Sequence, residues 1–338
     1  MIKEAIAALV EGKDLTFEEA SGAMNEIMNG EASPSQMASF LTALRMKGET
    51  AEEIAGLASV MREKSLKVEL SCPAIDIVGT GGDGSGSFNI STAAAFVAAG
   101  AGVKVAKHGN RAASSKCGSA DVLEALGVKI DLPPEGVKRC VEECGIGFMF
   151  AQVFHPAMKY VAPVRREIGV RTVFNILGPL TNPAGVRRIV LGVPSKPIGD
   201  KIARVLGILG TERAFVVHGC NGLDELSVSS PSFLWDIGNG GDPSANEVTP
   251  EDFGCGRYED GSICGGNAQE NAAALRGVLD GFPGPFHDAV VMNAAAGLLA
   301  AGAAETRLEA ANMARESITS AKAREKLEAL IMVSQSLK

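Results

Sequence analysis

The sequence has no long apolar run and no surplus of positive charge. No stretch of about 18 apolar residues occurs among its 338 residues, so we expect no membrane-spanning helix. The formal net charge is −8, which argues against a nucleic-acid partner because phosphate backbones bind to broad basic faces. The first residues, Met1 to Ile6, are typical of an amphipathic helix and do not form a signal peptide.

Paired cysteine motifs are also missing. The chain has seven cysteines, an odd number, and contains no C-x-x-C pair. Cys140 and Cys144 are one helical turn apart, which is more typical of packing than of metal ligation. Together with the missing export signal, this pattern favours a reducing cytoplasm as the compartment.

A third absence is local. Between Asp83 and Asp121 there is no Asp or Glu, although the chain holds 40 acidic residues. The β-branched run 75–78 predicts a buried strand, and five of the eight residues from Gly79 to Gly86 are glycine. Glycine at this density allows repeated positive φ and lets a ligand approach main-chain N–H groups. An Ala-rich helix is expected from about residue 91, and its N-terminus would favour an anion.

A second loop of the same kind follows a predicted strand at 103–106. It runs from Lys107 to Lys116 and is rich in hydrogen-bond donors. Two donor-rich loops at the ends of strands, with no acid between Asp83 and Asp121, indicate a site for a heavily phosphorylated small molecule. Residues 79–84 match G-x-G-x-x-G, but the acid that a dinucleotide site needs about 20 residues later is missing. The P-loop pattern fails as well, because no Gly-Lys-Ser/Thr follows.

The remaining pattern predicts a small N-terminal all-helical domain, residues 1–70, and a large α/β domain, residues 71–338. Three capping boxes mark helix starts, at Thr16, Ser33 and Thr50. Beyond residue 71, strands and helices alternate as in a mostly parallel central sheet flanked by helices. The expected strands are 75–78, 103–106, 147–150, 189–193 and 214–218, with a β-excursion of uncertain register at 228–262. The expected helices begin near 91 and then span 119–126, 134–144, 198–209, 268–280, 286–302, 306–321 and 323–335.

An acidic pair, Asp224 and Glu225, follows the strand 214–218. Adjacent acids in a loop are often only solvated. If the parallel strands end at one rim, however, this pair faces the donor-rich loops. Two carboxylates, with Ser91 as a further ligand, would then suffice for Mg²⁺ bridging to phosphate oxygens.

Six motifs closely resemble the anthranilate phosphoribosyltransferase family of tryptophan biosynthesis, and the resemblance extends over essentially the whole chain. The motifs are Asp76-x-Val78-Gly79-Thr80-Gly81-Gly82-Asp83 with Phe88-Asn89-Ile90-Ser91-Thr92, Lys107-His108-Gly109-Asn110-Arg111, Gly118-Ser119-Ala120-Asp121-Val122-Leu123-Glu124, Arg171-Thr172-x-Phe174-Asn175-x-Leu177-Gly178-Pro179-Leu180-Thr181-Asn182-Pro183, and Gly222-Leu223-Asp224-Glu225-Leu226-Ser227. The resemblance implies transfer of a phosphoribosyl group from 5-phosphoribosyl 1-diphosphate to anthranilate, and a homodimer formed through the helical domain.

The resemblance also implies a role for individual residues. Those implied to bind phosphoribosyl diphosphate are Gly79, Gly82, Asp83, Ser87, Asn89, Ile90, Ser91, Thr92, Lys107, His108, Gly109, Asn110, Arg111, Ala112, Ala113, Ser114, Ser115 and Ser119. Those implied to bind anthranilate are Gly79, Asn110 and Arg165, and those implied to bind metal are Ser91, Asp224 and Glu225, with two Mg²⁺ ions per subunit. No covalent nucleophile is expected. Ser87 and Cys117 stand where the family usually has Thr and Ser.

His108 is interpreted as an orienting donor in preference to a base, because a neutral aromatic amine attacks without prior deprotonation. Two other functions stay open at this point. A pyrimidine nucleoside phosphorylase shares the architecture but lacks the Arg171–Pro183 motif. A nucleic-acid-binding relative should be basic and should have lost Asp224, Glu225 or Arg165, and none of this holds here.

Overall fold

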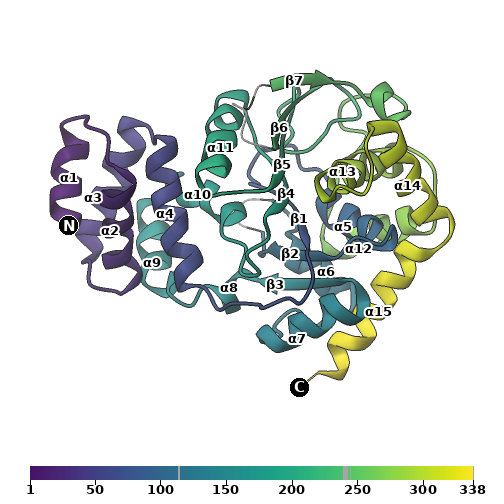
Figure 1. The fold of residues 1–338 in the computed structure, drawn as a ribbon, viewed down its shortest axis with the longest axis horizontal. Helices are drawn as coiled ribbons and strands as arrows, with labels where there is room; N and C mark the ends of the chain where they lie inside the picture. Colours follow the sequence, from purple (N-terminus) through teal and green to yellow (C-terminus); the bar gives the residue numbers. More distant parts are fainter. Residues whose placement is uncertain (113–114, 239–242, 244, 338) are drawn as a thin grey trace.

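A layer of helices lies at one end of the molecule (Figure 1). The computed structural model describes residues 1–112, 115–238, 243 and 245–337. All three predicted capping boxes are confirmed, with Thr16, Ser33 and Thr50 each accepting the expected N–H group. One later helix, α9, packs on α2 and α3. The helices of this layer are α1 (Ile2–Val10), α2 (Phe17–Met28), α3 (Pro34–Lys47), α4 (Ala51–Lys64) and α9 (Met158–Ile168).

The large part of the chain is built on one sheet of seven strands in the order β3-β2-β1-β4-β5-β6-β7. The first five strands along the chain pair in parallel, whereas β6 and β7 add an antiparallel edge. The fold class predicted from the sequence is therefore confirmed. The strands are β1 (Ile75–Gly79), β2 (Val105–Gly109), β3 (Ile146–Phe150), β4 (Arg188–Gly192), β5 (Arg213–Gly219), β6 (Ser232–Gly238) and β7 (Ala245–Val248).

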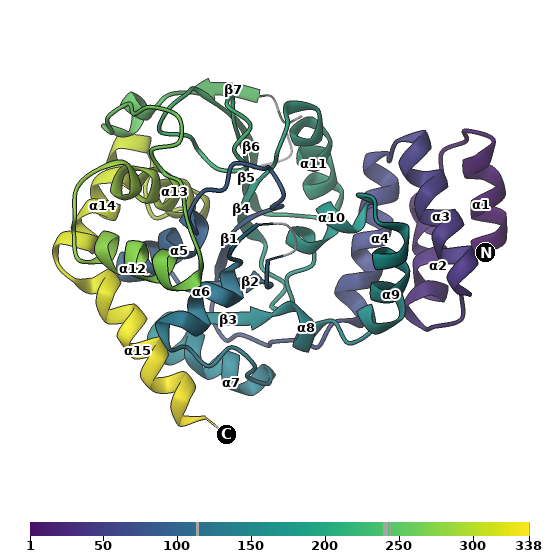
Figure 2. The ribbon, with the colours of Figure 1, turned by 180° about the vertical axis from the view of Figure 1, so that it is seen from behind.

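Helices cover both faces of the sheet (Figures 1 and 2). On one face, α5 and α13 pack against β1, and both are rich in alanine, which lets them approach each other closely. On the other face, α11 packs against β5 and β6 and also contacts α4. The remaining elements of the α/β part are α5 (Ile90–Gly100), α6 (Ser119–Leu126), α7 (Pro134–Arg139), a π-helical turn (Cys140–Cys144), α8 (Ala151–Phe154), α10 (Phe174–Leu177), a 3₁₀ turn (Gly178–Leu180), α11 (Lys196–Ile208), a second 3₁₀ turn (Pro250–Phe253), α12 (Ala268–Leu279), α13 (Pro285–Ala301), α14 (Arg307–Thr319) and α15 (Lys322–Ser336).

Alternation along the strands divides the interior into two apolar clusters. On β4, Val190 joins the cluster beneath α5 and α13, while Ile189 and Leu191 join the cluster that contains the buried residues of the N-terminal helices. A strand with both faces buried reads as a continuous apolar run, as this one does. The helical layer thus shares one core with the sheet, and the division into units at residue 70 stays a prediction.

Two of the differences from the expected element boundaries have a clear structural cause. Strand β2 begins at Val105 and not at 103, because its pairing with β3 runs from Val105 to Gly109. Lys107 and His108 therefore lie within a strand and not in a loop. The single helix expected at 134–144 is α7 followed by the π-helical turn, which Gly145 ends in the left-handed conformation.

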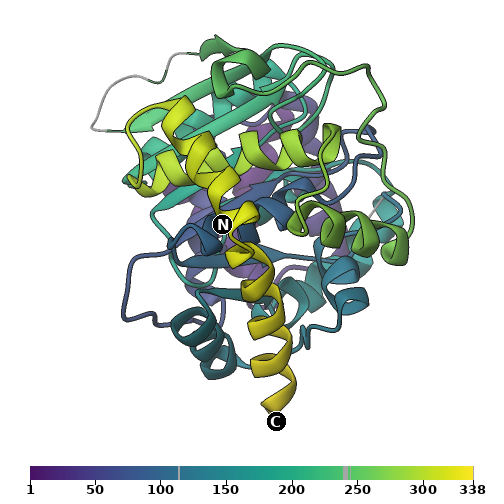
Figure 3. The same ribbon diagram turned by 90° about the vertical axis from the view of Figure 1, so that its right-hand side faces the viewer.

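The last helix of the chain runs past the end of the sheet (Figure 3). Among the described residues, no helix has the length and apolarity needed to cross a membrane.

Candidate active site

The glycine loop after β1 opens onto the N-terminus of α5. Gly81, Gly82, Gly84 and Gly86 all have positive φ, between 63° and 79°, which L-residues with a side chain rarely adopt. The N-cap residue Asn89 makes no side-chain bond to the first turn of its own helix. The Ile90 N–H donates to Phe88 O at 2.8 Å and the Ser91 N–H faces Glu225, so the Thr92 N–H is the group of the first turn that the missing cap leaves available, and such groups favour an anion.

The acidic pair after β5 lies against this glycine loop. Asp224 and Glu225 are only 7% and 6% exposed. The Gly81 N–H donates to Asp224 Oδ2 at 2.6 Å, and the Asp224 N–H donates to Asp83 Oδ2 at 3.3 Å. Burial, with a contribution from Asp83, raises the pKa of Asp224 to about 7. Burial and the neighbouring Asp224 raise the pKa of Glu225 to about 8.

One buried cation partly balances these acids. Lys107 is 2% exposed, and its Nζ donates to Ile77 O at 2.5 Å and to Ser91 Oγ at 3.3 Å. Burial lowers the pKa of Lys107, while Asp76 and Glu225 act in the opposite direction.

A divalent cation fits this donor set. Within the described ranges, no three His, Cys, Asp or Glu side chains form a complete metal cluster. Mg²⁺ is nevertheless commonly bound by one or two carboxylates, with water and substrate phosphate completing its shell. The raised pKa values of Asp224 and Glu225 show two buried carboxyl groups that lack sufficient compensating charge, which a cation would supply.

The gap between β1 and β2 is bridged by side chains. These strands pair only at Ile75 and Val105. Beyond that point the fully buried Asp76 accepts the His108 N–H at 3.1 Å and Asn182 Nδ2 at 2.8 Å. Asn182 also donates to Ala106 O at 2.8 Å. Asp76 and Asn182 thus hold the strand end that carries Lys107 and His108. Neither residue had a role predicted from the sequence, although both lie inside the motifs quoted above.

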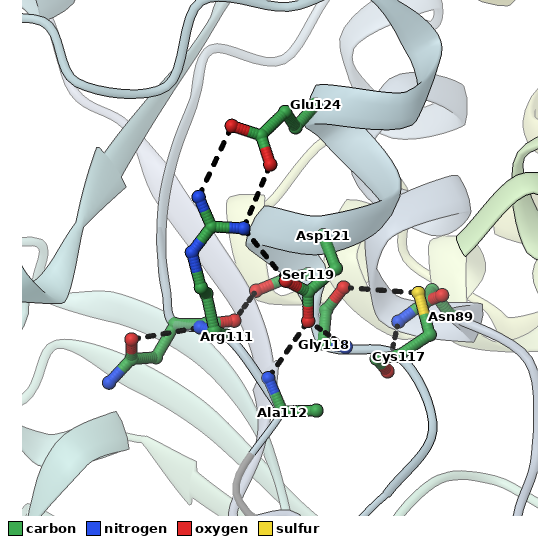
Figure 4. A network of polar contacts seen from close by, with 9 residues as sticks. Asn89, Arg111, Ala112, Cys117, Gly118, Ser119, Asp121 and Glu124 are labelled. Atoms are coloured by element: carbon green, nitrogen blue, oxygen red, sulfur yellow. Dashed lines mark hydrogen bonds and ion pairs between the residues drawn. The ribbon is translucent and has the colours of Figure 1, made fainter. Parts of the chain in front are cut away.

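The second donor loop is tied to the start of α6 (Figure 4). Asp121 Oδ2 accepts the N–H groups of Ala112 at 2.9 Å and Gly118 at 2.8 Å. The Arg111 guanidinium pairs with Asp121 at 2.9 Å and with Glu124 at 2.8 Å. The positive charge of Arg111 is therefore already paired with acids of α6 in this structure.

Three other predicted residues belong to the same loop. Ser119 Oγ donates to Asn110 O at 3.3 Å, and Ser115 Oγ donates to Cys117 O at 3.5 Å. The side chain of Asn110 is exposed at the start of the loop. Ala113 and Ser114, also predicted to bind the diphosphate, lie outside the described residues.

A pair of buried imidazoles lies beside the end of β2. The rings of His108 and His155 have centroids 5.0 Å apart. Burial lowers the pKa of His108 to about 3 and that of His155 to about 4, so both are neutral near pH 7. Within the described part of the chain, neither Nε2 atom has a hydrogen-bond partner. A group with a pKa near 3 is a poor base at neutral pH, which agrees with an orienting role.

Arg165 belongs to the helical layer, near the C-terminus of α9. Its guanidinium lies over the ring of Phe174, 5.3 Å from the ring centroid, and burial lowers its pKa. It forms no ion pair within residues 1–112, 115–238, 243 and 245–337. A few residues later, the Arg171 guanidinium donates to Gly82 O, which ties the segment after α9 to the glycine loop. Arg171 had no role predicted from the sequence.

The structure thus brings most of the predicted site residues to one rim. The side chains of Ile90 and Thr92 are buried, so these two residues can reach a ligand only through their main chain. Gly79, Ser87, Gly109 and Ala112 lie in or next to the two loops. The assigned role of each residue stays a prediction.

Comparison with known proteins gives consistent results. Residues 3–65 match the helical bundle domain of a glycosyl transferase family, and residues 71–324 match the a/b domain of the same family. The anthranilate phosphoribosyltransferase of Dehalococcoides mccartyi is 56% identical over 338 residues, covering 100% of this chain and 99% of the relative. That of Chloroflexus aurantiacus is 56% identical over 335 residues, covering 99% of each.

Solved structures agree with these relatives. The crystal structure of anthranilate phosphoribosyltransferase from Thermus thermophilus has a TM-score of 0.93 and 48% identity, covering 98% of this chain and 99% of that one. The Saccharomyces cerevisiae enzyme, solved in complex with PRPP and Mg, has a TM-score of 0.91 and 31% identity, covering 99% and 98%. From its fold, its rim of donors and acids, and these full-length likenesses, the chain belongs to the anthranilate phosphoribosyltransferase family of glycosyltransferases.

Proposed function

We propose that the rim formed by the two donor loops and the acidic pair is where the chain carries out its family's reaction. In that reaction the phosphoribosyl group of 5-phosphoribosyl 1-diphosphate passes to the nitrogen of anthranilate, a step in tryptophan biosynthesis. The observation that carries the proposal is the buried pair Asp224 and Glu225, held against a glycine loop that leads into an uncapped helix N-terminus. A metal-bound diphosphate suits both features, because its cation pairs with the acids and its anion with the N–H groups.

The chemistry needs positioning more than a reactive side chain. The amine nitrogen forms a bond to C1 of the ribose, the bond from C1 to the diphosphate oxygen breaks, and diphosphate leaves with the electron pair. The nitrogen then loses one proton to water. The N–H groups of the glycine loop and of α5 hold the diphosphate and stabilise the charge that it gains. Holding the amine near C1 removes much of the entropic barrier.

Asp224, Glu225 and Ser91 would hold Mg²⁺, and we propose two ions per subunit. Bound Mg²⁺ would neutralise charge on the departing diphosphate. The yeast relative solved with PRPP and Mg supports use of this metal. Titration with Mg²⁺ in the presence of phosphoribosyl diphosphate, followed by calorimetry, should give two ions per chain. A value of one would leave the transfer reaction intact but reject the stoichiometry.

For anthranilate we propose Arg165 as the carboxylate ligand, with Asn110 and Gly79 next to the reacting carbon. A guanidinium without an acid partner in the described ranges and half-buried against an aromatic ring is suited to bind a carboxylate. A homodimer through the helical layer is also proposed. The exposed side chains of Val10 and Met46, at 73% and 83%, support it. Sedimentation at micromolar concentration should give twice the chain mass.

A fluorescence assay tests the activity. Anthranilate fluorescence should fall only when phosphoribosyl diphosphate and Mg²⁺ are both present. Incubation with thymidine and phosphate should release no thymine, because the chain carries the Arg171–Pro183 motif that the phosphorylases lack. Thymine release without loss of anthranilate would overturn the proposal.

A further inference from the structure

A buried asparagine on α12 lies between the two donor loops. Asn271 is 2% exposed and belongs to none of the motifs quoted above. Its Oδ1 accepts the Gly266 N–H at 2.7 Å, and its Nδ2 donates to Asn89 Oδ1 at 2.9 Å. Asn89 Nδ2 in turn donates to Cys117 O at 3.2 Å (this last bond is drawn in Figure 4). One chain of amides thus connects α12, the start of α5 and the second donor loop.

Both amide orientations are fixed by main-chain groups. A backbone N–H can only donate, so the atom of Asn271 that faces Gly266 must be its oxygen. A backbone carbonyl can only accept, so the atom of Asn89 that faces Cys117 must be its nitrogen. The contact between the two side chains then follows, with Asn271 as the donor. Reversing either amide would leave buried polar groups without partners, which is unfavourable.

The consequence for Asn89 is unusual. Asparagine is among the best N-cap residues, because its side-chain oxygen accepts an N–H group from the first turn. Asn89 occupies the N-cap of α5 with φ −76° and ψ 69° and makes no such bond. By contrast, Thr16 caps α2 with φ −67° and ψ 165°. If Asn89 capped its own helix, it would occupy the N–H of Ser91, which faces Glu225, or that of Thr92, which the proposed anion site needs.

The loop before α12 is fitted closely to the glycine loop. The Gly265 N–H donates to Gly86 O at 2.8 Å, and the Phe88 N–H donates to Ile263 O at 3.1 Å. A Cβ atom on Gly265 would lie 2.8 Å from both Asn271 Oδ1 and Phe88 Cα, closer than real Cβ atoms come. The backbone just before Asn271 thus packs closely against the glycine loop.

We propose that Asn271 is a positioning residue for phosphoribosyl diphosphate. It draws the Asn89 side chain away from the N-terminus of α5 and so keeps the Thr92 N–H free for the anion. Through Asn89 it also holds the second donor loop at a fixed distance from the first. The proposal rests on the proposed function, because it concerns the affinity of the same site.

The test is a comparison of substrate affinities in Asn271→Leu, which keeps a similar volume without adding charge. The dissociation constant of phosphoribosyl diphosphate with Mg²⁺, measured by calorimetry, should rise about tenfold, as expected for losing a hydrogen bond that orders a binding group. The KM for anthranilate should stay within about twofold of the wild-type value. Equal rises for both substrates would reject the positioning role.

Ser317→Ala is the matched control. Ser317 is also 2% exposed, and its Oγ donates to Val97 O, at the other end of α5, at 2.8 Å. This variant should lower the melting temperature and leave the affinity for phosphoribosyl diphosphate unchanged. If Asn271→Leu does not fold, as judged by circular dichroism, Asn271→Ala replaces it under the same criteria.

A double-mutant cycle separates this role from simple packing. In an Asn89→Ala background, Asn271→Leu should weaken phosphoribosyl diphosphate binding no further. The Asn89 amide, which Asn271 holds away from the N-terminus of α5, is then already missing. Additive losses would overturn the proposal. Wild-type protein that neither binds the diphosphate nor consumes anthranilate would instead refute the proposed function. Active wild-type protein with an unaltered Asn271→Leu variant would refute the inference alone.

Discussion

The two sides of the candidate active site are built on opposite plans. On the donor side, polar groups lie in exposed loops, with Asn110, Arg111, Ser115 and Lys116 open to solvent. On the acid side, the acidic pair Asp224 and Glu225 is almost completely buried. Asn, Ser, Arg and Lys are normally exposed, so the donor side is ordinary, whereas the burial of two adjacent carboxylates is unusual.

The difference indicates how the donor side gains affinity for an anion and how the acid side gains affinity for a cation. Main-chain N–H groups in open loops are solvated at little cost and become useful when an anion covers them. Buried carboxylates are destabilised in advance, as the raised pKa values of Asp224 and Glu225 show, and a cation relieves that strain on binding. We expect the donor side to adapt its shape to the ligand and the acid side to fix its position.

The largest expected effect comes from removing the acid side. Asp224→Asn with Glu225→Gln should lower kcat at least about 100-fold, as is typical when electrostatic stabilisation of a transition state is lost. In metal-free buffer above about pH 8, where both wild-type acids are charged, the same variant should melt at a higher temperature, since it removes two buried charges. Turnover measured against Mg²⁺ concentration should become nearly flat.

The exposed Asp236, paired with Arg213 on the antiparallel edge, provides the control. Asp236→Asn should leave both turnover and the Mg²⁺ response unchanged. If turnover of the double variant still depended on Mg²⁺ as in the wild type, the metal would bind elsewhere. The proposed difference between the donor side and the acid side would then be wrong.

Next in size is the effect of Arg165, the aromatic-acid ligand proposed from the helical layer. Arg165→Ala should raise the KM for anthranilate about 30-fold, the value of a lost charge-assisted hydrogen-bond pair, and hardly alter that for phosphoribosyl diphosphate. Its neighbour Arg166 is exposed, so Arg166→Ala should change neither. Steady-state kinetics with each substrate varied in turn would decide, and parallel rises would remove Arg165 from the aromatic site.

The buried imidazole pair, His108 and His155, makes the free energy of unfolding depend on pH. This effect involves neither the donor side nor the acid side. Burial lowers the pKa of His108 to about 3 and that of His155 to about 4, below the ordinary value of 6.5. The unfolded chain therefore takes up protons first on acidification, and the free energy of unfolding falls between about pH 6.5 and pH 4. His155→Phe should flatten this fall in urea titrations between pH 7 and pH 4. An unchanged slope would show that the pair is accessible to protons in the folded state.

The smallest expected effect concerns the ion pair that draws Arg111 toward α6. Glu124→Gln breaks one exposed partner, so stability should change by no more than about 1 kcal/mol. The less restrained Arg111 should then lower the KM for phosphoribosyl diphosphate two- to threefold, as roughly 0.5 kcal/mol of competition is removed. A raised KM would mean that Glu124 shapes the donor loop and does not compete with the ligand.

Most of the fold followed from local patterns in the sequence. The capping boxes located three helix starts, and β-branched runs located the parallel strands, because such signals depend on neighbouring residues. The start of β2 was misplaced because it is set by pairing with β3, which is distant in sequence. The π-helical turn at Cys140–Cys144 carries no periodicity signal that distinguishes it from the preceding helix.

The site was predictable to the extent that its residues lie in motifs. The acid-free interval and the pair Asp224 and Glu225 were visible as composition. The bridges made by Asn182 and Asn271 were not, because a single buried amide has no spacing rule and its partners come from remote segments. That Arg111 faces Asp121 and Glu124 could not be read from the motif that contains it.

Gly79 and Gly192 pair with each other at the ends of β1 and β4. A substitution at either one would change how this enzyme depends on its metal. A Cβ atom on Gly192 would lie 1.6 Å from the Asp224 carbonyl oxygen, and one on Gly79 would lie 2.5 Å from Asp224 Oδ2. An alanine at either position would push the acidic turn outward while every ligand remained chemically intact. Such a variant would need more Mg²⁺ for activity and would recover in part at a higher Mg²⁺ concentration, although the substituted residue does not contact the metal.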